Sequence, residues 1–293
     1  MLMGVRQVFG LGLMISDPIT TADLVTVART AEKAGFTTLT IGGRETILDP
    51  TTILAALAAR TEQIGLVAAV NVDTALPYDF ARRLASLDHL SSGRAGWKPY
   101  STADEPDEAR IAEFVHAVSH LLDSWDDDAA VYDKESGIYV DISKVHRLDH
   151  IGEYYRVAGP LDIPRAPQGR PVLVQEVLAA DLAEGAWPTA DIIEIVPVPG
   201  QSTNKPLAPR AEGNTTLLSI VADTGDLASM HALLNDGDVD GATVRVAPRI
   251  DAVARAARDI GLWSKPRGSN LRDTLGLSRP ESLFALRRNG VSA

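Results

Sequence analysis

The chain has 293 residues, a net charge of −11 and a hydrophobic fraction of 45%, which is ordinary for a globular protein. No apolar run approaches the roughly 20 residues that span a bilayer, no Lys/Arg stripe is present to neutralise nucleic-acid phosphates, and the lack of cysteine excludes disulfides, thiolate metal sites and a thiol nucleophile. We therefore expect a cytoplasmic protein with a small-molecule substrate and with no nucleic-acid, membrane or metal partner.

Helical and strand-like patterns alternate through the first hundred residues. Thr20 or Thr21 can cap a helix whose apolar residues recur at helical spacing and which ends at Gly35. The pair Asp49-Pro50 is typical of a helix start, with aspartate as the cap and proline in the first turn. Strands are predicted over residues 8–15, 36–41, 64–70 and 95–100, and a third helix over residues 77–89.

The alternation of strand-like and helical patterns is interrupted after residue 125 and resumes at about residue 171. A helix with one apolar face is predicted over residues 107–125, and residues 126–169 then break the rhythm with Gly, Pro and mixed charges. We interpret residues 126–169 as an excursion that carries a hairpin through residues 154–157. Strands are predicted over residues 171–177, 191–196, 215–221 and 242–246, and helices over residues 179–185, 226–234 and 250–260. The segment 197–213 is polar and rich in Pro and Gly, where another helix would be expected.

Eight strand patterns separated by helical ones favour a compact (β/α)8 barrel, since parallel strands need crossover helices. An open, doubly wound sheet is the rival fold. No Gly-x-Gly-x-x-Gly motif or phosphate loop supports a nucleotide-binding version of that rival. We predict one barrel domain over residues 1–263, with the excursion at about 126–169 between strands four and five, followed by a C-terminal tail over residues 264–293.

Three blocks of sequence carry a resemblance to a known family. Residues 53–97 include the string LDHLSSGR at positions 87–94, residues 122–175 include Asp-Ser-Trp and Gln-Gly-Arg-Pro-Val runs, and residues 267–280 form the third block. In this order they resemble the nitrilotriacetate and dibenzothiophene-sulfone monooxygenase group of the bacterial luciferase-like flavin monooxygenase superfamily. The blocks cover about half of the chain.

The resemblance implies a barrel enzyme that uses FMN. In this superfamily the loops at the carboxyl ends of the strands build the flavin and substrate pocket, as barrel geometry requires. A separate flavin reductase is expected to supply reduced FMN, which reacts with O2 to oxygenate a small organic substrate. The resemblance also implies a homodimer that pairs through barrel helices.

The chain departs from this group at the pocket. It is shorter after strands two and four and between strands six and seven. After Trp97 the group carries Asn, two valines and Thr-Ser, whereas this chain has KPYST at positions 98–102. After Gln175 the group carries Ala-Gly-Ser-Ser, which holds the flavin phosphate, whereas this chain has EVLA at positions 176–179.

The change at Glu176 is the sharpest in chemical terms. A phosphate dianion needs free N–H groups, small residues and positive charge, and a carboxylate in the same place repels it. Lys98 lies at the neighbouring strand end and can pair with Glu176. Either that ion pair has replaced the phosphate or the flavin binds in an altered way, and we favour weakened or lost FMN binding.

The strand ends supply the candidate cofactor-binding residues, and no catalytic residue is assigned. Asn71 and Asp73 can instead form a turn, and Trp97 can merely pack against the helices. The candidates are Asn71, Asp73, Trp97, Lys98, Tyr100, Ser101, Gln175 and Glu176.

Other charged and histidine residues favour structural roles. We expect four charged residues of the best-matched block to form ion pairs that fix barrel packing, namely Arg82, Arg83, Asp88 and Arg94. His116 and His120 have metal-ligand spacing but lack an HExxH context, so we interpret them as solvated helix surface. His146 and His150 are interpreted as structural.

Two further functions stay open at this point. The first is a flavin-free barrel that serves as a binding or subunit-pairing protein. The second is a barrel with new acid–base chemistry around Glu176 and Lys98, carried by a lysine with a perturbed pKa.

Overall fold

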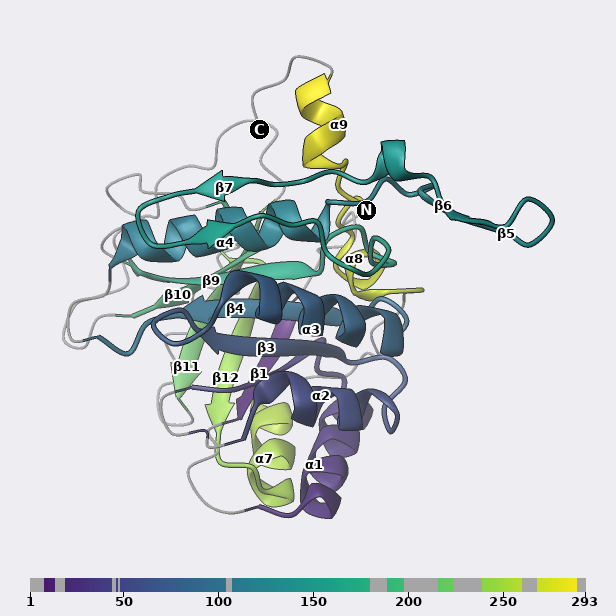
Figure 1. Cartoon of the computed structure of the whole chain (residues 1–293). Helices are drawn as coiled ribbons and strands as arrows, with labels where there is room; N and C mark the ends of the chain where they lie inside the picture. Colours follow the sequence, from purple (N-terminus) through teal and green to yellow (C-terminus); the bar gives the residue numbers. More distant parts are fainter. Residues whose placement is uncertain are drawn as a thin grey trace, which may run out of the picture.

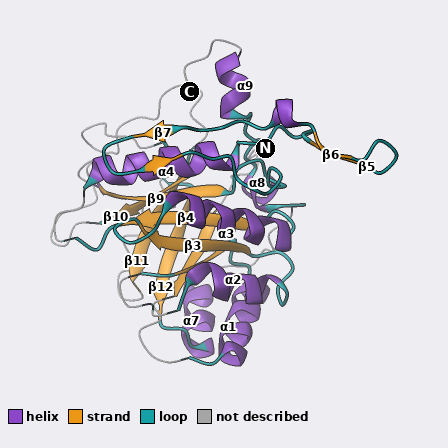
Figure 2. Ribbon diagram, viewed as in Figure 1, coloured by secondary structure: helices purple, strands orange, loops and turns teal. Residues whose placement is uncertain are grey.

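Eight parallel strands form a closed barrel in the order β1-β12-β11-β10-β9-β4-β3-β2, with helices on its outside (Figure 1, Figure 2). The structure is a computed structural model that describes residues 8–13, 19–43, 46, 48–103, 107–179, 189–197, 216–223, 239–259 and 268–288. The closed ring confirms the predicted barrel and excludes the open sheet. The barrel strands are β1 (Val8–Leu13), β2 (Thr38–Ile41), β3 (Gly65–Asn71), β4 (Ala95–Tyr100), β9 (Val172–Leu178), β10 (Ile192–Val196), β11 (Leu217–Asp223) and β12 (Gly241–Val246).

Helices α1 and α2 begin where local sequence signals predict, whereas the helix predicted over residues 107–125 ends at Leu122 and the two short helices of the tail were not predicted. Thr20 caps α1 by accepting from the backbone of Asp23, and Gly35 ends it in the left-handed conformation with φ 99°. Asp49 caps α2 in the same way. The helices are α1 (Thr21–Ala34), α2 (Pro50–Ala58), α3 (Pro77–Leu90), α4 (Glu108–Leu122), α7 (Ile250–Asp259), α8 (Leu271–Leu275) and α9 (Leu283–Arg288). None of them is long and apolar enough to cross a membrane.

The excursion after α4 contains two short hairpins. The first pairs β5 (Ala130–Asp133) with β6 (Ile138–Val140), and a 3-10 turn, η1 (Ile142–Lys144), follows it. The second pairs β7 (His150–Ile151) with β8 (Arg156–Val157) and matches the hairpin predicted through residues 154–157. The helices predicted over residues 179–185 and 226–234, and the polar segment 197–213, fall almost entirely outside the described residues.

The amino-terminal end of the barrel is filled by an apolar plug. Val67, Val172, Val174, Ile192 and Leu217 form one buried cluster with Leu271, Leu275 and Leu277 from the tail. Leu271 of α8 lies so close to β3 that a Cβ on Gly65 would meet its Cδ1 at 2.5 Å. Because the tail seals this end, the open end of the described barrel is the one at the carboxyl ends of the strands.

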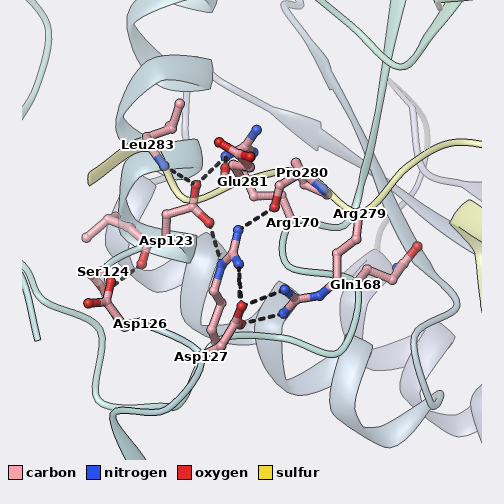
Figure 3. A network of polar contacts seen from close by, with 12 residues as sticks. Asp123, Ser124, Asp126, Asp127, Gln168, Arg170, Arg279, Pro280, Glu281 and Leu283 are labelled. Carbon is pink, nitrogen blue, oxygen red and sulfur yellow. Dashed lines mark hydrogen bonds and ion pairs between the residues drawn. The ribbon is translucent and has the colours of Figure 1, made fainter. Parts of the chain in front are cut away.

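A polar network holds the tail against the excursion (Figure 3). Asp123, just after α4, is fully buried, and it accepts from Arg165 at 2.8 Å, from Arg170 and from the backbone N–H of Leu283 at 3.0 Å. Asp127 pairs with Arg279 of the tail at 2.5 Å. Two arginines thus neutralise the buried carboxylate, as a buried charge requires, and the tail is fixed to the body of the protein.

The charged residues of the segment 82–94 have structural partners, but the predicted ion pairs form only at Arg82 and Arg83, while Asp88 and Arg94 bond to uncharged groups. Arg82 pairs with Asp162 and Arg83 with Asp49. Asp88 is buried and accepts from the backbone of Ala95 and from the side chain of Gln168, and Arg94 donates to Thr61 and to the carbonyls of residues 58, 61, 64 and 91.

The interpretation of His116 and His120 as solvated surface is wrong for His120. This residue is 2% exposed, and its ring packs edge-on against Phe284 of α9 at 6.0 Å. Helical spacing alone did not show that the tail would cover this face of α4. His146 and His150 have structural partners, with His146 bonded to Asp126 and His150 to Glu113, each at 2.9 Å.

Candidate functional site

A cavity of about 510 Å³ opens at the carboxyl ends of the barrel strands. This is the end at which barrel enzymes carry their active sites, and the volume lies within the range of small-molecule sites. One side of the cavity has small residues and the other side has charged ones. The described lining residues are Gly12, Leu13, Thr40, Gly42, Gly43, Thr46, Ala69, Lys98, Tyr100, Ser101, Glu176, Glu194, Thr243 and Arg245.

Lys98 is at the centre of the charged side. Its Nζ lies 2.5 Å from Glu176 Oε2 and 2.5 Å from Glu194 Oε2, so one ammonium joins β4 to β9 and β10. The side chains of Lys98 and Glu194 are 11% and 6% exposed, respectively. The ion pair between Lys98 and Glu176 that the sequence suggested is therefore present, and it includes a second carboxylate.

β12 completes the network from the other side. Arg245 donates from Nη2 to Glu176 Oε2 at 2.6 Å. Thr243, two residues earlier on the same face of the strand, donates to Glu194 Oε1 at 2.8 Å. The lining therefore holds two cations and two anions among its described residues, and their net charge is zero.

The charges in this network stabilise one another. Burial opposes the charged form of Lys98, but the carboxylates of Glu194 and Glu176 outweigh burial and raise the pKa of the lysine. Burial likewise opposes ionisation of Glu176, yet Lys98 and Arg245 lower the pKa of this carboxyl. A lysine whose pKa is raised stays protonated near neutral pH. This result argues against acid–base chemistry with Lys98 as the base.

Asn71 and Asp73 organise the loops at the rim of the cavity. The Asp73 carboxylate accepts from the hydroxyl of Ser101 at 2.9 Å and from the backbone N–H of Thr102 at 2.7 Å. Burial opposes its ionisation, but these hydrogen bonds prevail and lower its pKa. Asn71 accepts from the backbone N–H of Asp73 in a local turn. The structure thus brings Asn71, Asp73 and Ser101 together, and of these three only Ser101 lines the cavity.

Trp97 and Gln175 lie on the outer side of the barrel wall. Trp97 is 1% exposed and packs against Phe80 of α3 at 5.6 Å and against Phe114 of α4 at 6.3 Å. Gln175 and Trp97 both border a second cavity, of about 470 Å³, between the barrel wall and α4. Successive residues of a strand point to opposite faces, so Lys98 and Glu176 face the barrel mouth while their preceding neighbours face the helices.

The lining residues that complete the charged network with Lys98 and Glu176 escaped prediction from the sequence. Glu194, Thr243 and Arg245 lie in otherwise apolar strands. A lone acidic residue in the run DIIEIV and a Thr-x-Arg pair in ATVRV were the available signals. Alternation shows that Thr243 and Arg245 share a face, but the sequence does not show that Glu194 and Lys98 face them.

The described residues fit part of a flavin. Gly42, Gly43 and Ala69 form one side of the described lining, and among the described atoms an added Cβ on Gly43 would meet none within 4 Å, so this side leaves room for a flat ring. A phosphate dianion needs a cation that is not already neutralised. Both described cations of the lining, Lys98 and Arg245, are paired with carboxylates. The described lining therefore suits an uncharged planar ring better than the phosphate.

Comparison with known sequences shows similarity to flavin monooxygenases. The model of the luciferase-like monooxygenase family matches residues 1–205. One of the pristinamycin IIA synthase subunits of Streptomyces pristinaespiralis is 38% identical over 277 residues, which cover 92% of this chain and 94% of that protein. Nitrilotriacetate monooxygenase component A of Aminobacter aminovorans is 41% identical over 162 residues, which cover 50% of this chain and 36% of that protein. The chain thus matches little more than a third of the latter's length.

Comparison with solved structures supports the fold. A long-chain alkane monooxygenase superposes with a TM-score of 0.72 and 16% identity over 98% of this chain and 100% of that chain. A riboflavin lyase with modified FMN and riboflavin superposes with a TM-score of 0.70 and 21% identity over 94% of this chain and 97% of that chain.

Proposed function

Because the chain belongs to the luciferase-like monooxygenase family, we propose that it is a flavin monooxygenase subunit that oxygenates a small organic substrate at the barrel mouth. The cavity at the carboxyl ends of the strands carries this proposal, since it is the described space in which a flat ring and a substrate can meet. A relative is named nitrilotriacetate monooxygenase component A and another dibenzothiophene-sulfone monooxygenase. We infer a separate reductase as the source of reduced FMN.

Reduced FMN, when bound, would supply the two electrons with which O2 gives one oxygen atom to the substrate and one to water. The protein's part is to orient the ring and the substrate and to exclude bulk water. Asp73 fixes the rim by holding Ser101 and Thr102. Lys98 stays charged and holds Glu176 and Glu194 in place, so these side chains give the cavity a rigid polar wall.

We infer that this chain binds FMN more weakly than a site with a free cation would. Glu176 already neutralises Arg245 through one of its N–H groups, so a phosphate gains less from this arginine than from an unpaired one. Glu194 gives a matched comparison, because its hydrogen bonds among the described residues are with Lys98 and Thr243 and leave Arg245 untouched. Neutralising Glu176 should therefore help the phosphate more than neutralising Glu194.

The test is to measure the FMN affinity of the wild type and of the Glu176→Gln and Glu194→Gln variants. Each protein is titrated with FMN under anaerobic conditions, and flavin fluorescence reports binding. A charge-assisted hydrogen bond contributes roughly 1.5–3 kcal/mol, so Glu176→Gln should tighten FMN binding about tenfold or more, while Glu194→Gln should change it less. Equal responses from the two variants, or weaker binding in Glu176→Gln, would contradict the role given to Arg245. Activity is then measured with reduced FMN from a separate reductase.

A flavin-free pairing subunit is the alternative, and the comparisons do not favour it. Two different subunits of pristinamycin IIA synthase are both similar to this chain. This similarity supports a role as a subunit of a larger enzyme, whether or not the chain binds flavin. Absence of any flavin binding, by FMN or riboflavin at millimolar concentration, would point to the alternative and away from the oxygenase.

A further inference from the structure

A tyrosine of the excursion reaches the end of β3, beside the cavity. The hydroxyl of Tyr155, in the turn between β7 and β8, donates to the carbonyl of Val72 at 2.8 Å. Both residues are buried, with 7% and 0% of their surface exposed. The backbone N–H of Val72 donates to the carbonyl of Tyr100, at the end of β4, at 2.9 Å. Val72 therefore joins the excursion to a strand end that lines the cavity.

The residue after Val72 extends this connection to the lining. Asp73 accepts from the hydroxyl of Ser101 at 2.9 Å and from the backbone N–H of the following residue at 2.7 Å. Tyr100 and Ser101 belong to the described lining of the cavity. Because adjacent residues share a peptide plane, a displacement of the Val72 carbonyl moves Asp73 as well. The position of Tyr155 is thus transmitted to the lining through two consecutive residues at the end of β3.

Two side chains of α4 hold Tyr155 in place. Its ring packs edge-on against Phe114 at 5.6 Å. The carboxylate of Glu113 accepts from the backbone N–H of Tyr155 at 2.8 Å and from those of the two preceding residues at 3.0 Å each. Figure 1 shows the β7–β8 hairpin lying along α4. A side chain whose ring and backbone are both fixed presents its hydroxyl at a defined point, which a positioning group requires.

The turn that carries Tyr155 is built around the same carboxylate. The backbone N–H of Gly152 donates to the carbonyl of Tyr155 at 3.0 Å, and His150 is bonded to Glu113 at 2.9 Å. A Cβ on Gly152 would lie 2.0 Å from Oε1 of Glu113, so a larger residue here would displace the carboxylate. Glu113 thus bonds to three backbone N–H groups and one imidazole, and the turn cannot shift without breaking several of these hydrogen bonds.

Arg110, also of α4, fixes the direction in which the hydroxyl donates. Its Nε donates to the hydroxyl oxygen of Tyr155 at 3.3 Å, and its guanidinium carbon lies 5.8 Å from the centre of the same ring. An arginine only donates and a carbonyl only accepts. The hydroxyl therefore accepts from Arg110 and gives its own proton to the carbonyl of Val72. Because hydrogen bonds in a chain polarise one another, Arg110 strengthens the bond to β3.

We propose that Tyr155 is a positioning residue for ligand binding at the barrel mouth, which keeps Asp73 in place through Val72 and so orders Ser101 in the lining. Tyr155 is not among the described lining residues, so it acts through the rim and not by touching the ligand. This inference rests on the proposed function, because its effect on affinity assumes that a flavin ring binds in this cavity. It gives the second hairpin of the excursion a part in the site.

The test compares two hydroxyl deletions in adjacent residues. Tyr155→Phe keeps the packed ring and removes the bond to Val72. Tyr154→Phe is the matched control, since the hydroxyl of Tyr154 bonds to Asp107 at the start of α4 instead of to β3. Each protein is titrated with reduced riboflavin under anaerobic conditions. The net effect of one neutral hydrogen bond corresponds to about fivefold in affinity, so Tyr155→Phe should weaken binding by about that factor and the control by less than about twofold.

A double variant distinguishes positioning from a general loss of stability. If Tyr155 acts through Asp73, Tyr155→Phe should weaken riboflavin binding no further when Asp73→Asn is already present. Hydrogen–deuterium exchange of the Thr102 amide, whose N–H donates to Asp73, should be faster in Tyr155→Phe than in the wild type and the control. A structural role alone would lower the midpoint of urea unfolding and leave the riboflavin affinity unchanged.

The inference is overturned by an unchanged riboflavin affinity or unchanged Thr102 exchange in Tyr155→Phe, by an equal loss in Tyr154→Phe, or by an additive loss in the double variant. Failure of the proposed function gives a different result. If the wild type binds neither riboflavin nor FMN, the flavin proposal is wrong, and exchange of the Thr102 amide alone decides the role of Tyr155. Faster exchange in Tyr155→Phe but not in Tyr154→Phe then supports that role, and unchanged exchange contradicts it.

Discussion

Replacement of Lys98 by methionine should destabilise the barrel through one unpaired carboxylate. Lys98 neutralises Glu194, whose side chain is 6% exposed and whose other described hydrogen bond comes from the hydroxyl of Thr243. Glu176 keeps Arg245 in the variant. Removing one partner of a buried ion pair costs about 3–5 kcal/mol, so the variant should lose that much at pH 7.

The pH dependence of this loss follows from the pKa of Lys98. Burial opposes the charge of Lys98, but Glu194 and Glu176 outweigh burial and raise its pKa. The stability from this lysine is therefore present below the ordinary lysine pKa and is lost as the pH rises through the raised value, so the difference between wild type and variant should be full at pH 7 and should shrink in strongly alkaline solution. Urea unfolding followed by tryptophan fluorescence measures the free energy of unfolding at each pH. In thermal melts the loss at pH 7 corresponds to a decrease of roughly 5–8 °C in Tm for a chain of 293 residues.

A double variant supplies the control. Lys98→Met with Glu194→Gln removes the buried charge together with its partner, so most of the stability should return. A loss of less than about 1 kcal/mol in Lys98→Met, or a double variant no more stable than the single one, would refute the claim that Lys98 holds a buried carboxylate in its charged form.

Three further predictions concern the tail. Gly65→Ala should lower the free energy of urea unfolding by about 1–3 kcal/mol, because the added Cβ meets Leu271 of α8 at 2.5 Å. Adding Leu271→Ala to this variant should relieve the clash. An unchanged free energy of unfolding in the single variant would contradict the contact. Asp123→Asn should loosen residues 268–288, since it removes the charge shared by Arg165 and Arg170, and faster trypsin cleavage in the tail than in the wild type would show it. Burial lowers the pKa of His120 to about 4, so as the pH falls from about 6.5 to 4 the unfolded chain takes up a proton that the native chain does not. The free energy of unfolding should therefore decrease as the pH falls through that window, by about 3 kcal/mol at most. The variant His120→Gln should show a smaller decrease.

The sequence predicted the barrel because its signals are local. Gly35 ends α1 through its left-handed backbone, and Asp49 caps α2 through its side chain, so each boundary depends on residues within a few positions. The strand runs are continuous and apolar, as expected for strands buried on both faces. These features required no knowledge of the partners across the barrel.

The site was predicted only in part because it depends on register. Lys98 and Glu176 were identified, and they face the cavity; Trp97 and Gln175 were identified with them, and they face the helices. The sequence does not show which of two adjacent strand residues points inward when both faces are covered. Glu194 and Arg245 meet Glu176 and Lys98 across gaps of 69 to 96 residues, which single-sequence patterns do not reveal.

The tail and the excursion were predicted as segments, but the packing of the tail and the apolar face of the β5–β6 hairpin were missed for a related reason. Leu271, Leu275 and Leu277 are spaced like any short amphipathic helix, and nothing local shows that they fill the end of the barrel. Tyr132 and Tyr139 lie in a segment of mixed charge whose pattern predicted only an irregular excursion. The packing role of the tail leucines depends on barrel strands that are far away in the sequence.

The central claim is that the barrel mouth accepts a flavin ring while its own carboxylates occupy the cations a phosphate would need. Parallel anaerobic titrations of the wild type with reduced riboflavin and reduced FMN test it most directly, since the two ligands differ only by the phosphate. We expect affinities within about tenfold of each other, a difference of about 1.4 kcal/mol or less. FMN bound a hundredfold more tightly than riboflavin would mean that the phosphate is firmly held, and the claim would be wrong.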